Sequence, residues 1–176
     1  MDNKQSMTVA DYGGRDQYAT CQAREKALNE AILQADISEN FERYLELFDA
    51  FYADDLEVSS EMQGPTIRGK ARVRSLLADF LVPLHVMAEV GGLLVSVRES
   101  PIASDVADET HSLWILELVG VSGRTCTLSW RVARKWNGPC VVSEHHCDHQ
   151  QNGGPLTSAD LSWNGLGPVP ALRRPS

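Results

Sequence analysis

The chain has few cysteines, and none of them stands at the spacing that metal or redox sites use. Its 176 residues contain four cysteines, Cys21, Cys126, Cys140 and Cys147, with no C-x-x-C pair among them. This pattern excludes a zinc knuckle and a thioredoxin-type motif. A disulfide between Cys126 and Cys140 would need an oxidising compartment, which the start of the chain does not indicate. We therefore expect reduced, packed thiols.

Long hydrophobic runs and an excess of basic residues are also missing. The longest apolar runs, such as Leu113 to Leu116, are much shorter than the ~20 residues that a membrane helix needs. Met1 to Lys4 opens no signal peptide. Sixteen basic against 24 acidic residues give a net charge of −8, which argues against nucleic acid and an acidic membrane surface as partners. We expect a cytoplasmic protein without nucleic-acid or membrane partners.

Motifs for cofactors and activated nucleophiles are absent as well. The sequence contains no Gly-rich phosphate loop, nucleophile elbow or H-E-x-x-H. His145 and His146 with Asp148 stand too close along one predicted strand to form a metal site, because only alternate residues share a face. We therefore expect neither a cofactor nor a metal.

The hydrophobic period changes twice within one short stretch, Phe48 to Leu81. Apolar residues at steps of three and four predict a helix from Ser38 through Phe51. Residues that alternate with a period of two between an apolar and a polar face then predict a strand over Leu56 to Met62. A second amphipathic run predicts a helix that Pro83 ends.

Another helix and four strands complete the predicted elements. An apolar stripe predicts a helix from about Tyr18 to Ala35. After the second amphipathic run, four segments separated by Gly, Asn, Pro and Asp are typical of strands, namely 86–97, 111–121, 124–136 and 140–149. Residues 99–109 form an acidic connector. One domain over 17–150, between flexible tails at 1–16 and 151–176, suits this length.

Two phrases of the sequence resemble SnoaL-like members of the nuclear transport factor 2-like superfamily. The first is LFDAFYADDLEV followed by GPTIRGKARVRSLL, and the second is WRVARKWNGPCVVSEHHCD, which is similar to the last hairpin of that fold. The resemblance implies a cystatin-like α+β fold, in which a curved mixed sheet forms a cone closed by N-terminal helices. It implies no single activity, since the fold hosts isomerases, dehydratases, hydrolases, cyclases and modules without chemistry.

The histidine-rich end of the last predicted strand is the first candidate for chemistry. Val142, Glu144, His146 and Asp148 alternate and therefore point to one side of the sheet. If that side is concave, His146 lies between two carboxylates, which suits it to act as general base or acid with Glu144 as its partner. The alternative is a strand end whose polar residues, above all Asp148, are simply solvated.

The same hairpin also resembles the association domain of calcium/calmodulin-dependent protein kinase II. His146 and Cys147 match the second histidine and the cysteine of its "vHfHcSG" ending, whereas Glu144 and Asp148 replace its first histidine and its serine. These replacements make the segment more negative than the motif it resembles.

A second part of that resemblance concerns Arg131. The tripeptide around it, WRV, is similar to the "tRV" of the association domain and implies that the arginine faces a pocket. There it would hold an anion and be compensated by Glu144, Glu117 or Asp148. The alternative is an arginine on the exposed face of a hairpin.

Other candidates line the predicted cavity without a catalytic role. Ketosteroid isomerase, a further member of the superfamily, has its catalytic aspartate where this chain has Ser60, and a serine cannot abstract a carbon-bound proton unaided. Ser60 remains a ligand-binding candidate. Tyr44 is a second one, as a residue that lines the cavity together with Tyr52 and His85. The tryptophans are more simply aromatics of the core or of a dimer face: Trp114, Trp130 and Trp136.

These features predict a SnoaL-like small-molecule enzyme or binding protein. Its cofactor-independent acid–base chemistry would be of isomerase, cyclase, dehydratase or hydrolase type, on an apolar or acidic compound. The alternative is a non-catalytic dimerisation or assembly module like the kinase association domain. We also expect a homodimer through the convex face, because Leu128, Trp130 and Val132 alternate away from Arg131 and would otherwise form an exposed apolar patch.

Overall fold

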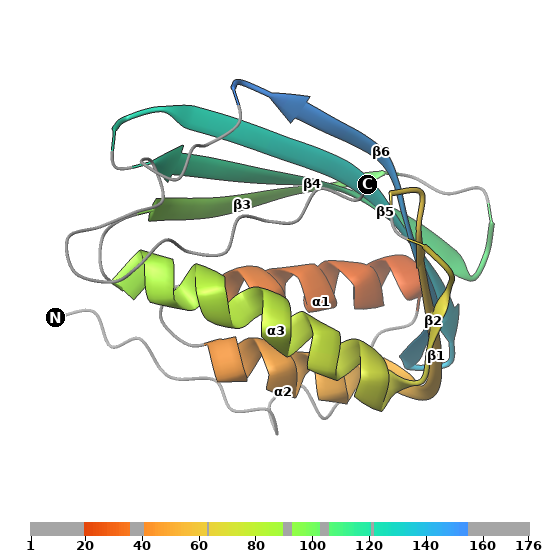
Figure 1. Ribbon diagram of the computed structural model, residues 1–176. Coiled ribbons are helices and arrows are strands. Elements are labelled where there is room, and N and C mark those ends of the chain that lie inside the picture. The colour runs from red at the N-terminus through yellow and green to blue at the C-terminus, as the bar shows by residue number, and fades with distance from the viewer. Residues whose placement is uncertain are drawn as a thin grey trace, which may run out of the picture.

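Helices pack against the concave face of a curved sheet (Figure 1). The computed structural model describes residues 20–35, 41–62, 64–89, 93–102, 106–120 and 122–154; of residues 83, 84, 86–89 and 93–101 it describes the backbone alone. The helices in this part of the chain are α1 (Cys21–Gln34), α2 (Phe41–Phe51) and α3 (Lys70–Glu89). The strands are β1 (Tyr52–Ser60), β2 (Ile67–Arg68), β3 (Leu93–Ile102), β4 (Glu109–Gly120), β5 (Thr125–Asn137) and β6 (Cys140–Asn152).

The sheet is mixed and has the order β2-β1-β6-β5-β4-β3. Strand β1 runs parallel to β6, and every other neighbouring pair is antiparallel. The three described helices lie within its curve, so the predicted α+β fold with a curved mixed sheet closed by helices is confirmed. The predicted tails lie largely outside the described residues, although β6 continues to Asn152. None of the helices among these residues has the length and apolar character that a membrane span requires.

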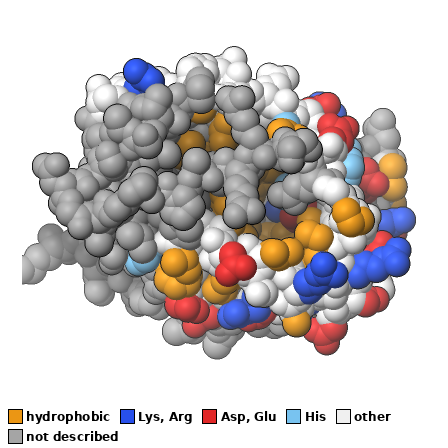
Figure 2. Space-filling view, viewed as in Figure 1, with side chains coloured by type: hydrophobic (Ala, Val, Ile, Leu, Met, Phe, Trp, Pro, Cys, Tyr) orange, Lys and Arg blue, Asp and Glu red, His pale blue; other side chains and the backbone are white. Residues whose placement is uncertain are grey.

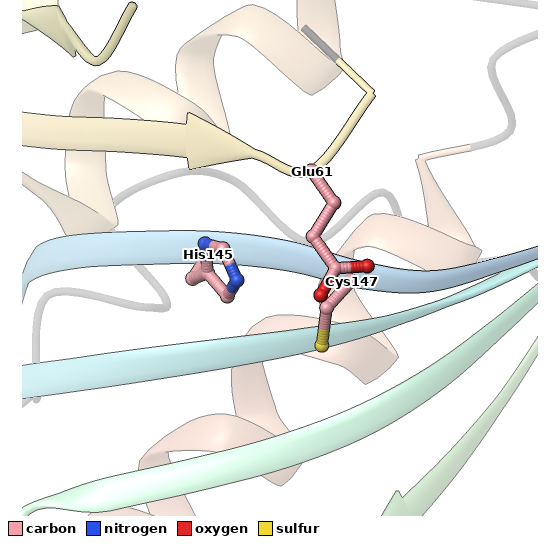
Figure 3. A group of neighbouring side chains, drawn as sticks. All are labelled: Glu61, His145 and Cys147. Carbon is pink, nitrogen blue, oxygen red and sulfur yellow. The ribbon is translucent and has the colours of Figure 1, made fainter.

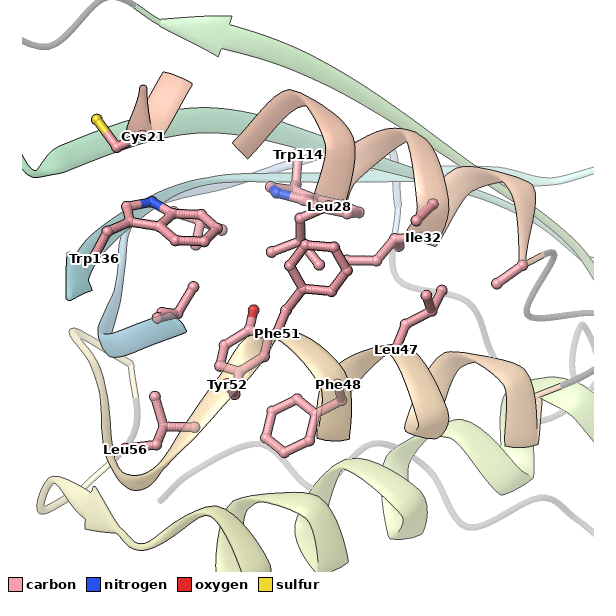
Figure 4. Close-up of a cluster of buried hydrophobic side chains, with 14 residues drawn as sticks. Cys21, Leu28, Ile32, Leu47, Phe48, Phe51, Tyr52, Leu56, Trp114 and Trp136 are labelled. Carbon is pink, nitrogen blue, oxygen red and sulfur yellow. The ribbon is translucent and has the colours of Figure 1, made fainter. Parts of the chain in front are cut away.

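Helix α1 begins at a capped turn and packs an apolar stripe against the sheet. The Thr20 hydroxyl accepts a hydrogen bond from the Ala23 amide at 3.2 Å, which satisfies a free donor of the first turn. Leu28 and Ile32, one turn apart on α1, are buried in the core together with Trp114 of β4 (Figure 4). Burial of these large side chains fixes α1 across the concave face of the sheet.

Helix α2 passes into β1 without a loop, and the predicted strand start at Leu56 is wrong by four residues. Phe51 ends the helix and Tyr52, paired with Val141 of β6, begins the strand. The rings of Phe48 and Tyr52 stack with centroids 4.4 Å apart. Aromatic packing and pairing with β6 therefore hold Tyr52 in the sheet, and its side chain in the core.

The predicted helix end at Pro83 is also wrong, because α3 continues to Glu89. A proline inside a helix removes one backbone donor and bends the helix, but it does not always end it. As a result the next strand, β3, starts at Leu93 rather than at 86 and takes up Glu99 to Ile102, which we expected in the acidic connector. These residues pair with β4, where Ile102 faces His111.

Alternation along β4 and β5 defines the two faces of the sheet. Every second residue of β4 from Thr110 onward is buried, including Ser112 and Trp114. Val132 of β5 pairs with Ser112 and is 2% exposed, within the core cluster. The prediction that Val132 lies on the convex face is therefore wrong, and this residue does not contribute to an exposed apolar patch for a dimer. The homodimer itself stays a prediction.

Candidate active site

Arg134 of β5 is the centre of a buried polar network on the concave side of the sheet. Its Nε donates to Glu144 Oε2 at 2.7 Å and to the Tyr52 hydroxyl at 3.1 Å. Its Nη1 donates to Glu25 Oε1 at 2.6 Å and to Asn29 Oδ1 at 3.1 Å. The arginine side chain is 4% exposed. A guanidinium so deeply buried needs carboxylate compensation, and two carboxylates from different elements supply it.

The Glu25 end of this network is closed by hydroxyl and amide donors. Ser112 Oγ donates to Glu25 Oε1 at 2.6 Å, and Thr110 Oγ1 donates to Oε2 at 2.8 Å. Asn29 Nδ2 adds a third hydrogen bond to Glu25, at 3.0 Å. The indole of Trp136 donates to Thr110 Oγ1 at 2.8 Å. Each carboxylate oxygen of Glu25 therefore accepts a hydrogen bond from a hydroxyl of β4, and these bonds hold α1 on the sheet.

The Glu144 end keeps its carboxylate ionised. Burial alone would raise the pKa of Glu144, but the charge of Arg134 and the hydrogen bonds from His146 and Tyr52 outweigh it and hold that pKa well below its usual range. The Tyr52 hydroxyl donates to Glu144 Oε2 at 2.6 Å. Burial raises the pKa of Tyr52 well above its ordinary value, so it remains a phenol and a donor. Glu144 is thus an anchored carboxylate whose Oε1 is directed to a further partner.

That partner is His146, two residues along β6. His146 Nε2 lies 2.6 Å from Glu144 Oε1, and the imidazole is 29% exposed against 11% for the carboxylate. Because an ionised carboxylate can only accept, His146 Nε2 carries the proton of this hydrogen bond. In the neutral ring Nδ1 is then the nitrogen with a lone pair. The dyad can therefore accept a proton at Nδ1.

The concave side also provides an apolar surface near the dyad. Figure 2 shows the molecule hollowed between the sheet and α3, with hydrophobic side chains at depth. Val58 and Tyr44 are partly buried and pack against the core cluster. Burial, reinforced by the charge of Glu144 and opposed by Arg134, raises the pKa of Tyr44 to about 12. A bound compound would therefore meet apolar surface and a neutral phenol beside the dyad.

Two tryptophans contribute unused donors to the same side of the sheet. Trp114 and Trp130 are register partners on β4 and β5. Their Nε1 atoms are buried and, within the part of the chain that the structure describes, have no hydrogen-bond partner. A buried donor without an acceptor is unfavourable, so each indole is suited to an acceptor that a ligand or water brings.

Comparisons with known proteins identify the fold. No protein-family model and no curated protein sequence matches the chain. A proposed SnoaL-like polyketide cyclase from Mesorhizobium loti is similar to it, with a TM-score of 0.51 and 14% identity over 80% of this chain and 99% of that one. The chain has the SnoaL-like, nuclear transport factor 2-like fold. A proposed polyketide cyclase from Xanthomonas campestris agrees, with a TM-score of 0.50 and 16% identity over 72% of this chain and 91% of that one.

The SnoaL-like fold brings four of the sequence-predicted site residues to its concave side. His146 and Glu144 are in direct contact. Ser60 is the register partner of His146 in β1, and its hydroxyl accepts a hydrogen bond from the Met62 amide at 3.2 Å. Tyr44 of α2 packs against the core cluster, near enough to Glu144 for that carboxylate to raise its pKa. Their roles in binding or catalysis remain proposals.

The other three predicted residues lie on the outer face of the sheet. Arg131 Nη1 is 3.3 Å from Asp148 Oδ2, and the two side chains are 43% and 54% exposed. Glu117 alternates with the buried Leu116 and Leu118 of β4. The structure therefore does not bring Arg131, Asp148 or Glu117 to the dyad.

Bulges in β6 explain why simple alternation misplaced part of that strand. The register shifts between the pairs Trp136↔Val141 and Lys135↔Ser143, so that Val141, and not Val142, faces the core. A second shift follows Arg131↔Cys147, and Asp148 there has a φ of 54°. Each bulge adds one residue and reverses the face of those that follow.

Sequence reasoning missed Arg134 and Glu25. Arg134 alternates with Val132 and Trp136, and a charge between two large apolar residues of one face is a sign of a buried ion. Glu25 lies one turn before Leu28 on the apolar stripe of α1. Both signals were present in the sequence, but pairing the two residues required the tertiary register.

Proposed function

We propose that this chain is a small-molecule enzyme in which His146, positioned by Glu144, carries out acid–base chemistry without a cofactor. The observation that supports this most is the 2.6 Å contact between His146 Nε2 and an ionised, anchored Glu144. A general base must be both oriented and accessible, and a 29% exposed imidazole held by a buried carboxylate meets both conditions.

The proposed reaction starts with proton abstraction by His146 Nδ1. Glu144 fixes the tautomer and stabilises the imidazolium that forms, while Arg134 and Tyr52 keep the carboxylate in place. The same imidazolium then returns the proton to another atom of the compound. Isomerisation and cyclisation of carbonyl compounds both follow this sequence of steps, which need no redox group.

The geometry favours a neutral, apolar compound with a carbonyl oxygen over an acidic one. Within the described network one guanidinium faces two carboxylates, so Arg134 has no surplus positive charge to hold an anion. The indole donors of Trp114 and Trp130 have no hydrogen-bond partner among the described residues and suit a carbonyl oxygen, whose developing negative charge they would stabilise. Tyr44 and Ser60 are the proposed lining residues.

A matched pair on the other face provides the control. His111 Nε2 lies 2.6 Å from Glu109 Oε1, with the same two-residue spacing as the dyad, but both side chains are on the outer face of β4. His111→Ala therefore removes an equivalent histidine from outside the concave side.

The experiment is solvent-deuterium exchange at the carbon next to the carbonyl in a panel of apolar cyclic ketones. We expect His146→Ala to reduce exchange by about 10²- to 10⁴-fold and His111→Ala to leave it unchanged. Equal exchange in His146→Ala and the parent would place the base elsewhere. If the parent neither binds nor exchanges any compound of the panel, an assembly module like the kinase association domain becomes the better hypothesis.

A further inference from the structure

A second group of reactive side chains lies on the outer face of the sheet, opposite the dyad. Glu61 follows the end of β1, and His145 and Cys147 alternate on β6 (Figure 3). One potential ligand atom from each residue, a carboxylate oxygen, an imidazole nitrogen and the sulfur, lies within 4.8 Å of the other two. His145 lies between Glu144 and His146 in sequence and points to the other side of the strand.

The imidazole of His145 is held by a hydrogen bond at its other nitrogen. Ser59 Oγ lies 2.8 Å from His145 Nδ1, and the two residues are register partners in β1 and β6. This contact leaves Nε2 as the nitrogen available for a ligand bond. Metal-binding histidines commonly have such a partner on the second nitrogen, which sets the tautomer and the ring orientation.

Glu61 is tied to the same strand by its backbone and by one carboxylate oxygen. Its amide donates to the His146 carbonyl at 3.0 Å, so it extends the pairing of β1 with β6. Its Oε2 accepts from the Asp148 amide at 3.1 Å. The carboxylate is therefore held beside β6 while Oε1 remains outside that hydrogen bond.

The electrostatic surroundings of Cys147 favour a cation. The carboxylate of Glu61 is held at the Asp148 amide, at 3.1 Å, and Asp148 Oδ2 lies 3.3 Å from Arg131 Nη1, so two carboxylates face one guanidinium beside this group. Such an excess of negative charge attracts a divalent metal.

We propose that Glu61, His145 and Cys147 bind one zinc ion, with the fourth position open to water. Thiolate, imidazole and carboxylate are all zinc ligands, and their combined charge of −2 balances the ion. Bond lengths of ~2.0 to 2.3 Å in a tetrahedron place ligand atoms roughly 3.5 Å apart. Atoms that lie within 4.8 Å of one another then need to approach by at most roughly 1.3 Å. Binding transfers the thiol proton of Cys147 to solvent as the zinc–sulfur bond forms.

This site was not expected from the sequence, because its third ligand is not local. His145 and His146 lie on opposite faces of β6, as alternation requires. The third ligand is instead Glu61, which the parallel pairing of β1 with β6 brings to the outer face. The proposal is independent of the dyad and of any activity there.

The test uses cobalt(II) as a spectroscopic probe and zinc as competitor, with the full-length protein in a metal-free reducing buffer. We expect one cobalt per chain and a thiolate-to-cobalt charge-transfer band in the near ultraviolet, which one equivalent of zinc removes. Cys147→Ser should abolish the band. Cys140→Ser, which removes another partly exposed cysteine of β6, should retain it.

Two more variants distinguish this site from adventitious binding. Glu61→Gln should weaken zinc binding at least tenfold while its exposed side chain leaves the fold intact, and Ser59→Ala should weaken it by about tenfold through the orientation of His145. A charge-transfer band that persists in Cys147→Ser would overturn the proposal. So would an unchanged affinity in Glu61→Gln, or the absence of saturable cobalt binding in the parent.

Discussion

Arg134 Nη1 and Glu25 Oε1 lie 2.6 Å apart, although 109 residues separate them in the chain. The ion pair joins α1 to β5, and Nε of the same guanidinium joins β5 to Glu144 of β6. One buried arginine therefore both fixes the first helix on the sheet and positions the carboxylate that holds His146. Stability and the proposed chemistry depend on the same group.

Arg134→Ala should destabilise the protein by about 3 to 5 kcal/mol, because it leaves the carboxylates of Glu25 and Glu144 buried without their counter-ion. Such a loss is a large part of the total stability of a domain, ~5 to 15 kcal/mol. The measurement is urea denaturation monitored by tryptophan fluorescence. Arg131→Ala is the matched control, since its ion pair with Asp148 is exposed and should contribute less than about 1 kcal/mol. Equal losses in the two variants would contradict the assignment of Arg134 as the buried centre.

The raised pKa of Tyr44 predicts a loss of stability at high pH. In the unfolded chain the phenol titrates near 10.0, and in the fold near 12. Below pH 10 both states hold the proton, so stability is unaffected; between pH 10 and 12 the unfolded state loses its proton first and is favoured. Two pKa units correspond to roughly 2 to 3 kcal/mol of lost stability by pH 12.

Thermal melting of the parent and of Tyr44→Phe across this pH range checks the prediction. The variant should lose less stability between pH 10 and 12 than the parent, although Tyr52, whose pKa is also raised, still contributes. Parallel losses in the two proteins would assign the alkaline sensitivity to other groups.

Gly153 should not tolerate a side chain. Its φ is +88°, and a Cβ atom at this position would lie 2.5 Å from the backbone oxygen of Thr125. The left-handed conformation alone costs a non-glycine residue ~1 to 2 kcal/mol, and the close contact with backbone adds to this. Gly153→Ala should therefore lower the free energy of unfolding by more than about 1 kcal/mol. Gly154→Ala, where an added Cβ meets nothing within 4 Å, should have little effect.

The sequence predicted the elements well wherever one hydrophobic period ran without interruption. Strand β4, with strict alternation over twelve residues, starts and ends within two residues of its predicted bounds. The predicted bounds are wrong at two places where a local rule did not decide the structure. Tyr52 belongs to the sheet because it pairs with Val141, and α3 continues past Pro83.

The site was predictable to the extent that it is local. The contact of His146 with Glu144 follows from the alternation of neighbouring residues on one strand. The partners of the counter-ion could not be found in the same way. Alternation with Val132 and Trp136 indicates that Arg134 is buried, but its pairing with Glu25 and Glu144 depends on how α1, β5 and β6 come together in the fold.

Tyr52 provides the last test, because its hydroxyl both donates to Glu144 Oε2 at 2.6 Å and accepts from Arg134 Nε at 3.1 Å. Tyr52→Phe keeps the buried ring and its stacking on Phe48 but removes both hydrogen bonds. Hydrogen bonds to charged groups contribute ~1.5 to 3 kcal/mol each, and the direct Arg134–Glu144 pair remains, so we expect a net loss of about 2 kcal/mol.

The measurement is the urea midpoint at constant m value, with Tyr44→Phe at neutral pH as the control for loss of a concave-side phenol. If Glu144 positions His146, Tyr52→Phe should also reduce the deuterium exchange of the parent, although the imidazole itself is untouched. A stable variant with full exchange would mean that Arg134 alone is sufficient to hold the carboxylate.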